Sequence, residues 1–479
     1  MNLIFDLRVL SLLLVLISTF QLFPLMLAYG LGENPLPLAK SIGITSLVSG
    51  LGLFLTRKAR PVMAPRDGFL VTSLGWFLAS LFGGLPYVFH GGLDFPSAFF
   101  ETASGFTTTG SSTLTDIEVW PQSILLWRST TQWLGGMGMV LMAIAILPFL
   151  GVGGTQLMKA EVPGPTKDRM TPRLISTARA LWGVYSLLTV ISIIGFVLCG
   201  MTWLEGVNHT FTALATGGFS TKNLSLGFYS PAAQWWATLM MAAGGMNFLI
   251  HYRVIVLRDW KAFTYEEFKG YLTIIALFLC FFVPVLMRWT DKWDFEEVVR
   301  HALFQIISIM TTTGFASTDW EQWPAVLQLL LGLTMIIGGM SGSTGGGIKV
   351  VRTQVLLKTI PSVTTRLLEP NQVVVQKMDG QPIPRTILEN AVAVFILFLG
   401  YVLFGGMLLN AMGMDLLSAM GAALTACANV GPGFNSVGAM DNFAHVPDFG
   451  KIILGSLMIV GRLEIFTILL LFSRQFWRN

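Results

Sequence analysis

Long apolar runs alternate with short polar segments along most of the chain. Ten runs reach the roughly 20 residues that a helix needs to cross about 30 Å of hydrocarbon. They lie near residues 7–29, 35–56, 68–90, 124–149, 175–202, 233–257, 268–287, 323–357, 386–412 and 449–473. After the first pair, each odd-numbered run is followed by a stretch that is too polar to cross a membrane and too apolar for a simple loop. The pattern predicts an all-α membrane protein with ten spans and four partly apolar insertions.

Composition supports this prediction and excludes several classes of function. Only 12% of the 479 residues are charged, 53% are hydrophobic, and the mean hydropathy is +0.67. An ordinary soluble domain has about 25% charged residues, so a soluble fold of this size would lack the charges to cover its surface. The sequence therefore excludes a soluble enzyme, a nucleic-acid-binding protein and a disordered scaffold. The net charge of +4 is small and does not indicate a nucleic-acid partner.

The distribution of Lys and Arg predicts the orientation, because cytoplasmic segments carry an excess of these residues. Groups of cations follow the even-numbered runs and end the chain: Arg57, Lys58, Arg60 and Arg66; Lys159, Lys167, Arg169, Arg173 and Arg179; Arg253, Arg258, Lys261 and Lys269; Arg352, Lys358, Arg366, Lys377 and Arg385; Arg474 and Arg478. Both termini are therefore expected in the cytoplasm, and the partly apolar insertions on the outer side. The run from Val9 to Ala28 exceeds the roughly 7–15 residues of a signal-peptide core, so we expect it to be retained as the first span.

A four-residue pattern recurs in the partly apolar insertions. Its copies, here called the glycine turns, are Thr107-Thr108-Thr109-Gly110, Ala215-Thr216-Gly217-Gly218, Thr311-Thr312-Thr313-Gly314 and Ala428-Asn429-Val430-Gly431. Their final glycines are 108, 96 and 117 residues apart. A second landmark, Gly136, Gly245, Gly339 and Arg462, lies 26, 27, 25 and 31 residues beyond these glycines. Two landmarks at nearly constant spacing indicate an internal repeat of four units.

Each repeat contains two complete crossings, so all four units are expected to have the same orientation and can surround one axis. The predicted architecture is two N-terminal spans followed by four parallel helix–pore-helix–filter–helix repeats around a pseudo-fourfold central pore. The expected boundaries are 1–60 for the N-terminal extension and 61–150, 151–262, 263–360 and 361–479 for the repeats.

The residue types of the glycine turns point to a site for a monovalent cation. Extended backbone at membrane depth is tolerated where it is buried in protein or lines water, and its carbonyl oxygens can there replace the hydration shell of a cation. Glycine permits close approach of the backbone, and threonine hydroxyls can add oxygens. A Ca²⁺ site would instead contain carboxylates. We therefore interpret the turns as one filter, with potassium at Thr108, Thr109, Thr216, Gly217, Thr312, Thr313, Asn429 and Val430. The alternative is that the glycines only permit close helix packing.

These motifs make the chain similar to the Trk/Ktr/HKT superfamily of potassium transporters, and most similar to its bacterial TrkH branch, over essentially the whole sequence. The extra pair of runs at 7–56 matches this branch. The resemblance implies that Gly110, Gly218, Gly314 and Gly431 are filter glycines. Gly110 implies potassium, because serine at this position is associated with sodium preference in some plant members. The resemblance also implies a homodimer and a TrkA-type cytosolic subunit that binds nucleotides such as ATP or NAD(H).

The eighth run predicts a gate below the filter. It has 35 residues, which is about 52 Å of straight helix. The segment 338–347, here called the glycine-rich loop, contains so many glycines that the helix should break there. We expect Gly345, Gly346, Gly347 and the following Lys349 at the gate, with Lys349 facing the inner vestibule or extending to the membrane surface. This segment lacks the register of a phosphate-binding loop, because Ile348 occupies the lysine position.

Two further charges lie inside apolar or partly apolar segments. Arg462 is in the tenth run, where a charge is costly and usually functional. We expect it on the permeation axis, hydrogen-bonded to carbonyls of 340–347; the alternative is an ion pair with a carboxylate of another helix. Glu101 is expected to hold its pore helix through a hydrogen bond, or else to add negative potential at the mouth.

The predicted function is potassium uptake across the bacterial inner membrane, driven by the membrane potential, and not an enzymatic reaction. The alternative is Na⁺- or H⁺-coupled potassium symport, with Glu464 as the deep carboxylate. A membrane-embedded enzyme would need His, Asp or Ser residues together at one depth, and the sequence shows no such group. No cofactor is expected apart from the transported K⁺. The basic cytoplasmic segments suit anionic membrane lipid or an acidic partner.

Overall fold

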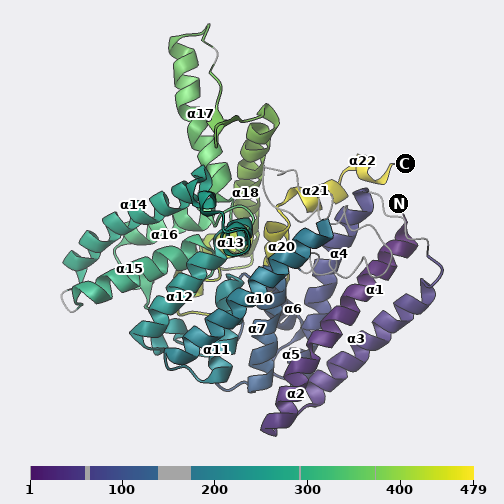
Figure 1. Ribbon diagram of the computed structural model, residues 1–479. Coiled ribbons are helices and arrows are strands. Elements are labelled where there is room, and N and C mark those ends of the chain that lie inside the picture. The colour runs from purple at the N-terminus through teal and green to yellow at the C-terminus, as the bar shows by residue number, and fades with distance from the viewer. Residues whose placement is uncertain (1, 60–64, 139–173, 291–292, 373, 479) are drawn as a thin grey trace.

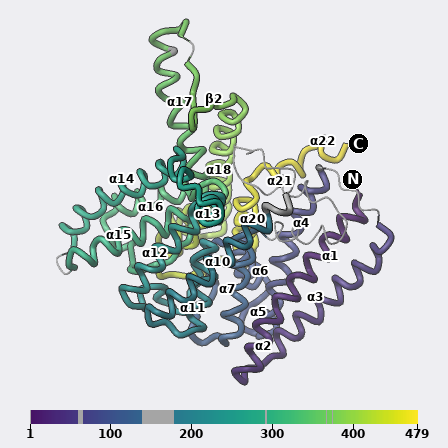
Figure 2. The backbone as a smooth tube through the Cα atoms, in the orientation of Figure 1, coloured from purple at the N-terminus to yellow at the C-terminus, as the bar shows by residue number. Residues whose placement is uncertain are grey.

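The computed structural model describes residues 2–59, 65–138, 174–290, 293–372 and 374–478. Helices dominate these residues, as the sequence predicts, with one antiparallel pair, β1 (Lys377–Met378) and β2 (Gln381–Pro382). Figures 1 and 2 show the helices gathered into one body from which α17 projects. Of the predicted features, the boundaries at residues 60/61 and 150/151 lie outside the described residues, as do the cations Arg60, Lys159, Lys167, Arg169 and Arg173.

The N-terminal extension consists of α1 (Leu3–Phe20), α2 (Leu22–Leu31) and α3 (Leu36–Leu55). α1 packs against both α3 and α4, because one of its faces is lined by apolar residues such as Val9, Leu13 and Ile17 that are buried. A side chain at Gly52 of α3 would overlap the Ser11 hydroxyl, so glycine permits the close contact between α1 and α3.

Four successions of a long helix, a short helix, a glycine turn and a second helix follow. The first unit contains α4 (Pro65–Gly83), α5 (Leu85–His90), α6 (Phe95–Phe106) and α7 (Gln122–Gly136), and the second contains α10 (Leu174–Leu198), α11 (Trp203–Leu214), α12 (Pro231–Gly244) and α13 (Phe248–Ile255). The third unit contains α14 (Glu266–Trp289), α15 (Phe295–Met310), α16 (Ala325–Ile337) and α17 (Val350–Leu368). The fourth unit contains α18 (Arg385–Ala411), α19 (Leu416–Ala428), α20 (Asp448–Arg462), α21 (Phe466–Leu471) and α22 (Arg474–Trp477). Single-turn helices η2 (Ser225–Phe228), η3 (Trp260–Thr264), η4 (Trp320–Gln322) and η5 (Asn435–Val437) lie in the connections.

The short helices α6, α11, α15 and α19 have 12, 12, 16 and 13 residues. At 1.5 Å per residue they are about 18–24 Å long, which is less than the hydrocarbon thickness of about 30 Å. A side chain caps the N-terminus of each, from Asp94, Thr202, Asp294 and Asp415. Because these caps satisfy free N–H groups, the sequence itself determines where each short helix begins.

The second helix of each unit packs on the short helix of the next. α7 packs on α11, α12 on α15, and α16 on α19. α20 of the fourth unit packs on α6 of the first unit. The contacts therefore form a closed cycle, and the glycine turns follow directly on the short helices that take part in it.

Two of the ten predicted spans are interrupted where no break was expected. Six described helical segments are long and apolar enough to cross a membrane: Leu3–Leu31, Leu36–Leu55, Arg66–His90, Ala178–Leu198, Glu266–Trp289 and Arg385–Ala411. The runs 233–257 and 449–473 are each interrupted, as is the glycine-containing run 323–357 for which a break was predicted. The run 124–149 contains α7 as far as Gly136, and its part beyond residue 138 lies outside the described residues.

The unexpected breaks have local causes. After α12, Asn247 begins a new helix because its side chain accepts a hydrogen bond from the Leu249 amide. After α20, Glu464 and Ile465 both adopt positive φ angles, of 55° and 58°. Such angles end an α-helix, because L-residues cannot continue the right-handed ladder through them. Arg462 consequently lies at the end of a helix and not in the middle of a span.

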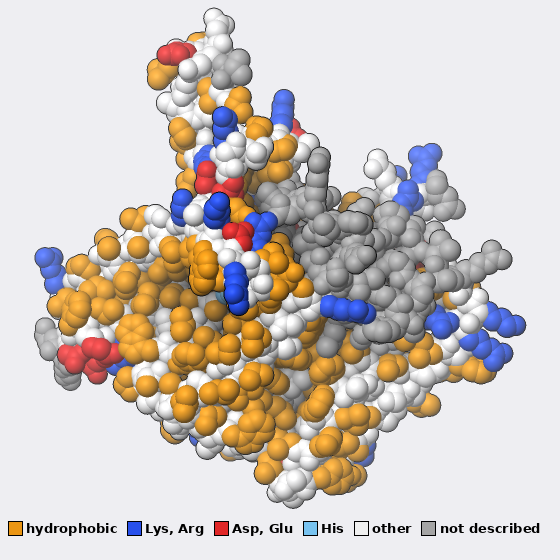
Figure 3. Space-filling model, in the orientation of Figure 1, with side chains coloured by type: hydrophobic (Ala, Val, Ile, Leu, Met, Phe, Trp, Pro, Cys, Tyr) orange, Lys and Arg blue, Asp and Glu red, His pale blue; other side chains and the backbone are white. Residues whose placement is uncertain are grey.

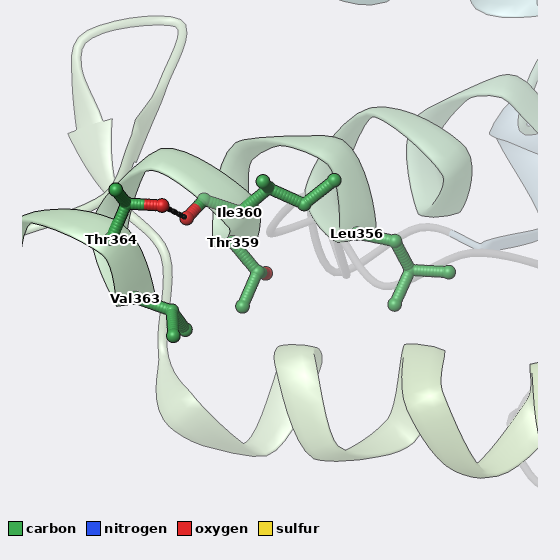
Figure 4. Close-up of a pocket in the computed structure, with 5 residues that line it drawn as sticks. All are labelled: Leu356, Thr359, Ile360, Val363 and Thr364. Atoms are coloured by element: carbon green, nitrogen blue, oxygen red, sulfur yellow. Dashed lines mark hydrogen bonds between the residues drawn. The ribbon is translucent and has the colours of Figure 1, made fainter. Parts of the chain in front are cut away.

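Exposed apolar side chains cover the flank of the body. Figure 3 shows them over α10 to α16, while most Lys and Arg side chains gather toward the end that carries α17 and both termini. The outward residues include Leu277 and Phe281 of α14 and Leu329 of α16. An apolar surface of this kind is suited to contact with the hydrocarbon chains of a lipid bilayer. A pocket lies on α17 itself, lined by Leu356, Thr359, Ile360, Val363 and Thr364 (Figure 4); its lining has no charged group that could bind an ion.

Candidate functional site

The four glycine turns lie against one another in a closed cycle. A side chain at Gly110 would overlap the carbonyl oxygen of Gly217, and one at Gly218 that of Thr313. A side chain at Gly314 would overlap the carbonyl oxygen of Val430, and one at Gly431 would place its Cβ 2.9 Å from that of Thr109. The third residue of each turn therefore presents its carbonyl to the glycine of a neighbouring turn.

The four turns share one backbone conformation. Their second residues, Thr108, Thr216, Thr312 and Asn429, have φ angles of 56°, 53°, 60° and 56°. Their glycines, Gly110, Gly218, Gly314 and Gly431, have φ angles of 89°, 77°, 81° and 112°. The third-residue amides all donate back to the short helix, at 2.9, 2.8, 2.8 and 3.1 Å. Because these N–H groups are hydrogen-bonded to the short helices, the backbone of each turn is held so that the carbonyl of its third residue projects toward a neighbouring turn.

The threonine side chains mostly stabilise the turns. The hydroxyls of Thr107 and Thr109 lie 2.8 Å apart, and those of Thr311 and Thr313 lie 2.7 Å apart. The Thr107 hydroxyl also donates to Ala103 at 2.6 Å. In the structure these hydroxyls bond to protein atoms, and their predicted role as additional ion ligands stays a prediction. Thr108 differs, because its buried hydroxyl lacks a hydrogen-bond partner among the described residues.

The glycine-rich loop contacts three turns at the C-terminal ends of their short helices. The Gly346 amide donates to the Thr312 hydroxyl at 2.6 Å, and the Gly347 amide donates to the Ala428 carbonyl at 3.0 Å. The Thr344 hydroxyl donates to the Leu214 carbonyl at 2.9 Å and accepts from Thr216 at 3.1 Å. The loop therefore lies directly beside the turns, and the hydrogen bonds keep it there.

Arg462 and Lys349 both hold the glycine-rich loop. The Arg462 guanidinium donates to the Thr344 carbonyl at 2.6 Å and to the Gly135 carbonyl at 2.7 Å. Lys349 is 3% exposed and its ammonium donates to the Gly345 carbonyl. Lys349 is thus buried, which excludes the predicted alternative that it extends to the membrane surface. Arg462 connects the loop to the end of α7 in the first unit.

Two carboxylates near the loop have partners that the sequence did not indicate. Glu464 pairs with Arg352 at 2.6 Å. Glu267, in the first turn of α14, accepts the Ser341 amide at 2.6 Å and so holds the start of the loop. Nothing in the local sequence predicts either contact, because the partners are far apart along the chain.

Glu101 holds the segment that follows the first glycine turn. It is fully buried and accepts the Thr113 amide at 2.8 Å. Its charge partner is Arg128 of α7, at 2.7 Å, which sequence reasoning missed. Arg128 in turn donates to the Ser220 carbonyl at 3.0 Å, just beyond the second turn. The ion pair therefore joins the segments that follow two neighbouring turns.

Arg128→Met is expected to lower the free energy of unfolding by about 3–5 kcal/mol, because it leaves the buried Glu101 carboxylate without its cation. The double variant Glu101→Gln/Arg128→Met removes both charges and should recover part of this loss. The measurement is thermal unfolding of the purified protein in detergent. Arg385→Met, which breaks an exposed pair with Glu389, is the control and should change stability by at most about 1 kcal/mol. An equal loss in the single and double variants would contradict the prediction.

Comparisons with known proteins point to one family. The family model for TrkH, described as a cation transport protein, matches residues 38–290 and 271–478. The Trk system potassium uptake protein TrkH of Halomonas elongata is 36% identical over 487 residues, which cover 100% of both chains. The protein of the same name from Escherichia coli (strain K12) is 34% identical over 483 residues, covering 98% of this chain and 99% of that one.

A solved structure shares the fold. The crystal structure of the potassium transporter TrkH from Vibrio parahaemolyticus matches with a TM-score of 0.89 and 33% sequence identity, covering 100% of both chains. The predicted resemblance and the exclusion of an enzymatic function are thereby confirmed. The chain belongs to the TrkH family of cation transport proteins.

Proposed function

We propose that this protein admits K⁺ to the cytoplasm along an axis enclosed by the four glycine turns, with four pseudo-equivalent repeats around it. The observation that carries the proposal is the closed cycle in which each turn presents a carbonyl to the glycine of its neighbour. Uncharged oxygens in a cycle can replace the hydration shell of a monovalent ion and still release it. The relatives' names, which state potassium uptake, support K⁺ as the transported ion.

The short helices strengthen the attraction for a cation. Each of α6, α11, α15 and α19 ends where a glycine turn begins. The C-terminus of a helix carries a partial negative charge of roughly half an elementary charge. Four such ends near one site favour a cation without a carboxylate. The membrane potential then supplies about 2.3 kcal/mol per charge per 100 mV for inward movement.

The glycine-rich loop and Arg462 form the proposed gate. The loop is hydrogen-bonded to three turns, and Arg462 brings a positive charge to the same place. A cation leaving the turns would have to displace these groups. The side-chain nitrogen of Lys349 also holds the Gly345 carbonyl. The loop and Arg462 are therefore expected to slow the passage of ions until a signal moves the loop.

The remaining expectations concern the assembly. We propose a bacterial inner-membrane location with both termini cytoplasmic, a homodimer, a TrkA-type regulatory subunit, and repeats bounded at residues 61, 151, 263 and 361. The exposed apolar flank supports a membrane location. The relatives' names place those proteins in a Trk system, which supports a second component.

Voltage-driven uptake is expected from the purified protein in vesicles loaded with KCl and placed in K⁺-free, Na⁺-free buffer of equal pH. Outward K⁺ movement makes the interior negative, and ⁸⁶Rb⁺ added outside should accumulate, because an uncoupled pore needs only the voltage. Protein-free vesicles are the control. Uptake that appears only when a Na⁺ or pH gradient is imposed would contradict the pore and favour coupled symport.

A further inference from the structure

The second glycine turn lacks the internal hydroxyl pair of the first and third. In those turns, the first and third residues are threonines whose hydroxyls lie 2.8 and 2.7 Å apart. Ala215 and Gly217 occupy these positions in the second turn, and neither has a hydroxyl. The turn nevertheless has the same backbone angles as the others. Some other group must therefore hold it.

Gln132 of α7 supplies that group from the neighbouring unit. Its Nε2 donates to the Gly217 carbonyl at 2.5 Å, and its Oε1 accepts the Phe219 amide at 3.1 Å. Gln132 is fully buried, so no water competes for these bonds. A single side chain thus holds the turn on both sides of Gly218.

Gly217 and Gln132 occupy complementary space. A Cβ atom at Gly217 would overlap the side-chain amide of Gln132. The first and third turns, which have threonine at this position, have room for it. At the register of Gln132, four residues before the second landmark, the other units have Met241, Met335 and Met458. Glycine in the turn and glutamine in the helix therefore belong together as one substitute for the threonine pair.

The Gly217 carbonyl differs in its hydrogen bonding from the third-residue carbonyls of the other three turns. Among the described residues, no N–H or O–H group donates to the carbonyls of Thr109, Thr313 or Val430. The Gly217 carbonyl alone of the four receives a side-chain donor there. A donated hydrogen bond fixes the direction of a carbonyl and draws electron density from it. Both effects change how that oxygen coordinates a cation.

We propose that Gln132 is a positioning residue that sets the K⁺ over Na⁺ preference by fixing the Gly217 carbonyl. This inference rests on the proposed function, since it assumes that the Gly217 oxygen faces the ion. Without the amide, the carbonyl is free to move toward a smaller ion. The loss of Gln132 therefore weakens discrimination against Na⁺ more than it weakens transport.

The test uses the full chain in the vesicle assay, with Na⁺ as competitor of ⁸⁶Rb⁺ uptake. Gln132→Met, which introduces the residue of the other three units, should lower the Na⁺ concentration needed for half inhibition on the order of tenfold, as expected for the loss of buried hydrogen bonds. Gln328→Met is the matched control. Gln328 of α16 donates to the carbonyls of Glu321 and Trp323 at 2.6 and 2.9 Å, away from the turns, and its loss should leave the competition unchanged.

A rescue variant separates positioning from general damage. Gln132→Ala/Ala215→Thr/Gly217→Thr removes the amide and introduces the hydroxyl pair of the first and third turns. It should restore discrimination to within about threefold of the wild type, whereas Gln132→Ala alone should not. Gly217→Thr alone should abolish selective uptake, because the new side chain overlaps Gln132.

The outcomes distinguish this inference from the proposed function. Unchanged Na⁺ competition in folded Gln132→Met, with altered competition in Gly110→Ser, overturns the role of Gln132 and leaves the proposed filter in place. Unchanged competition in both variants overturns the proposed filter itself. A triple variant no better than Gln132→Ala also overturns the inference, because the hydroxyl pair would then not replace the amide.

Discussion

Gly314→Ser is expected to remove most selective ⁸⁶Rb⁺ uptake and to lower K⁺ over Na⁺ discrimination by at least about tenfold. Gly314 has a φ angle of 81°, which only glycine adopts readily. Its missing side chain leaves room for the Val430 carbonyl, and a Cβ atom would also lie 2.8 Å from Pro432. A serine side chain would therefore push one carbonyl away from the common axis.

The measurement is ⁸⁶Rb⁺ uptake, with and without Na⁺, in cells that lack their own potassium uptake systems. Gly110→Ser should behave similarly, because a side chain there overlaps the Gly217 carbonyl. Gly91→Ser is the matched control: Gly91 has nearly the same φ angle, 82°, but nothing lies within 4 Å of its added Cβ. It separates backbone strain from displacement of a carbonyl. Equal uptake by wild type, Gly110→Ser and Gly314→Ser would remove the assignment of the filter.

Arg462→Ala is expected to increase ion flux by about tenfold or more. A unit charge about 4 Å from the path of a cation costs on the order of 4 kcal/mol at an effective dielectric constant of about 20. The substitution removes this charge and also frees the Thr344 carbonyl of the glycine-rich loop. Both changes should lower the barrier below the turns. The measurement is the initial rate of ⁸⁶Rb⁺ uptake into vesicles with equal amounts of incorporated protein.

Two further substitutions separate the charge of Arg462 from its hydrogen bonds. Arg462→Gln keeps donors for the carbonyls and removes the charge, and Arg462→Lys keeps the charge and loses the planar fork. If charge repulsion dominates, the uptake rate of Arg462→Gln should resemble that of Arg462→Ala, and the rate of Arg462→Lys should resemble that of the wild type. Arg385→Ala removes an exposed charge and should leave the rate unchanged. Unchanged or lower flux in well-expressed Arg462→Ala would contradict the gate.

Several features of this protein could be read from the sequence because they depend on residues close together along the chain. Apolar length and low charge predicted a helical membrane protein, and the family comparison confirms the resemblance drawn from the motifs. The break in the run 323–357 followed from its glycines. The identity of the filter and gate residues stays a prediction that the substitutions above test.

Other features required the tertiary structure, because their cause is contact between distant segments. Arg128 is 27 residues from Glu101, and Gln132 is 85 residues from Gly217. Neither residue differs in local pattern from an ordinary polar residue in an apolar helix. The breaks after α12 and α20 were also missed. Asn247 caps the start of α13, and Glu464 has a positive φ angle after α20, and a hydropathy pattern detects neither feature.

The sequence alone determined the composition of the membrane body, the recurrence of the glycine turns and the family. The tertiary structure alone decided which carbonyl meets which glycine and which side chain holds each turn. The physical reason is that helix formation and hydropathy depend on neighbours within a few turns of the chain. A cycle of four turns exists only when segments about a hundred residues apart come together, and the packing of α20 on α6 closes it.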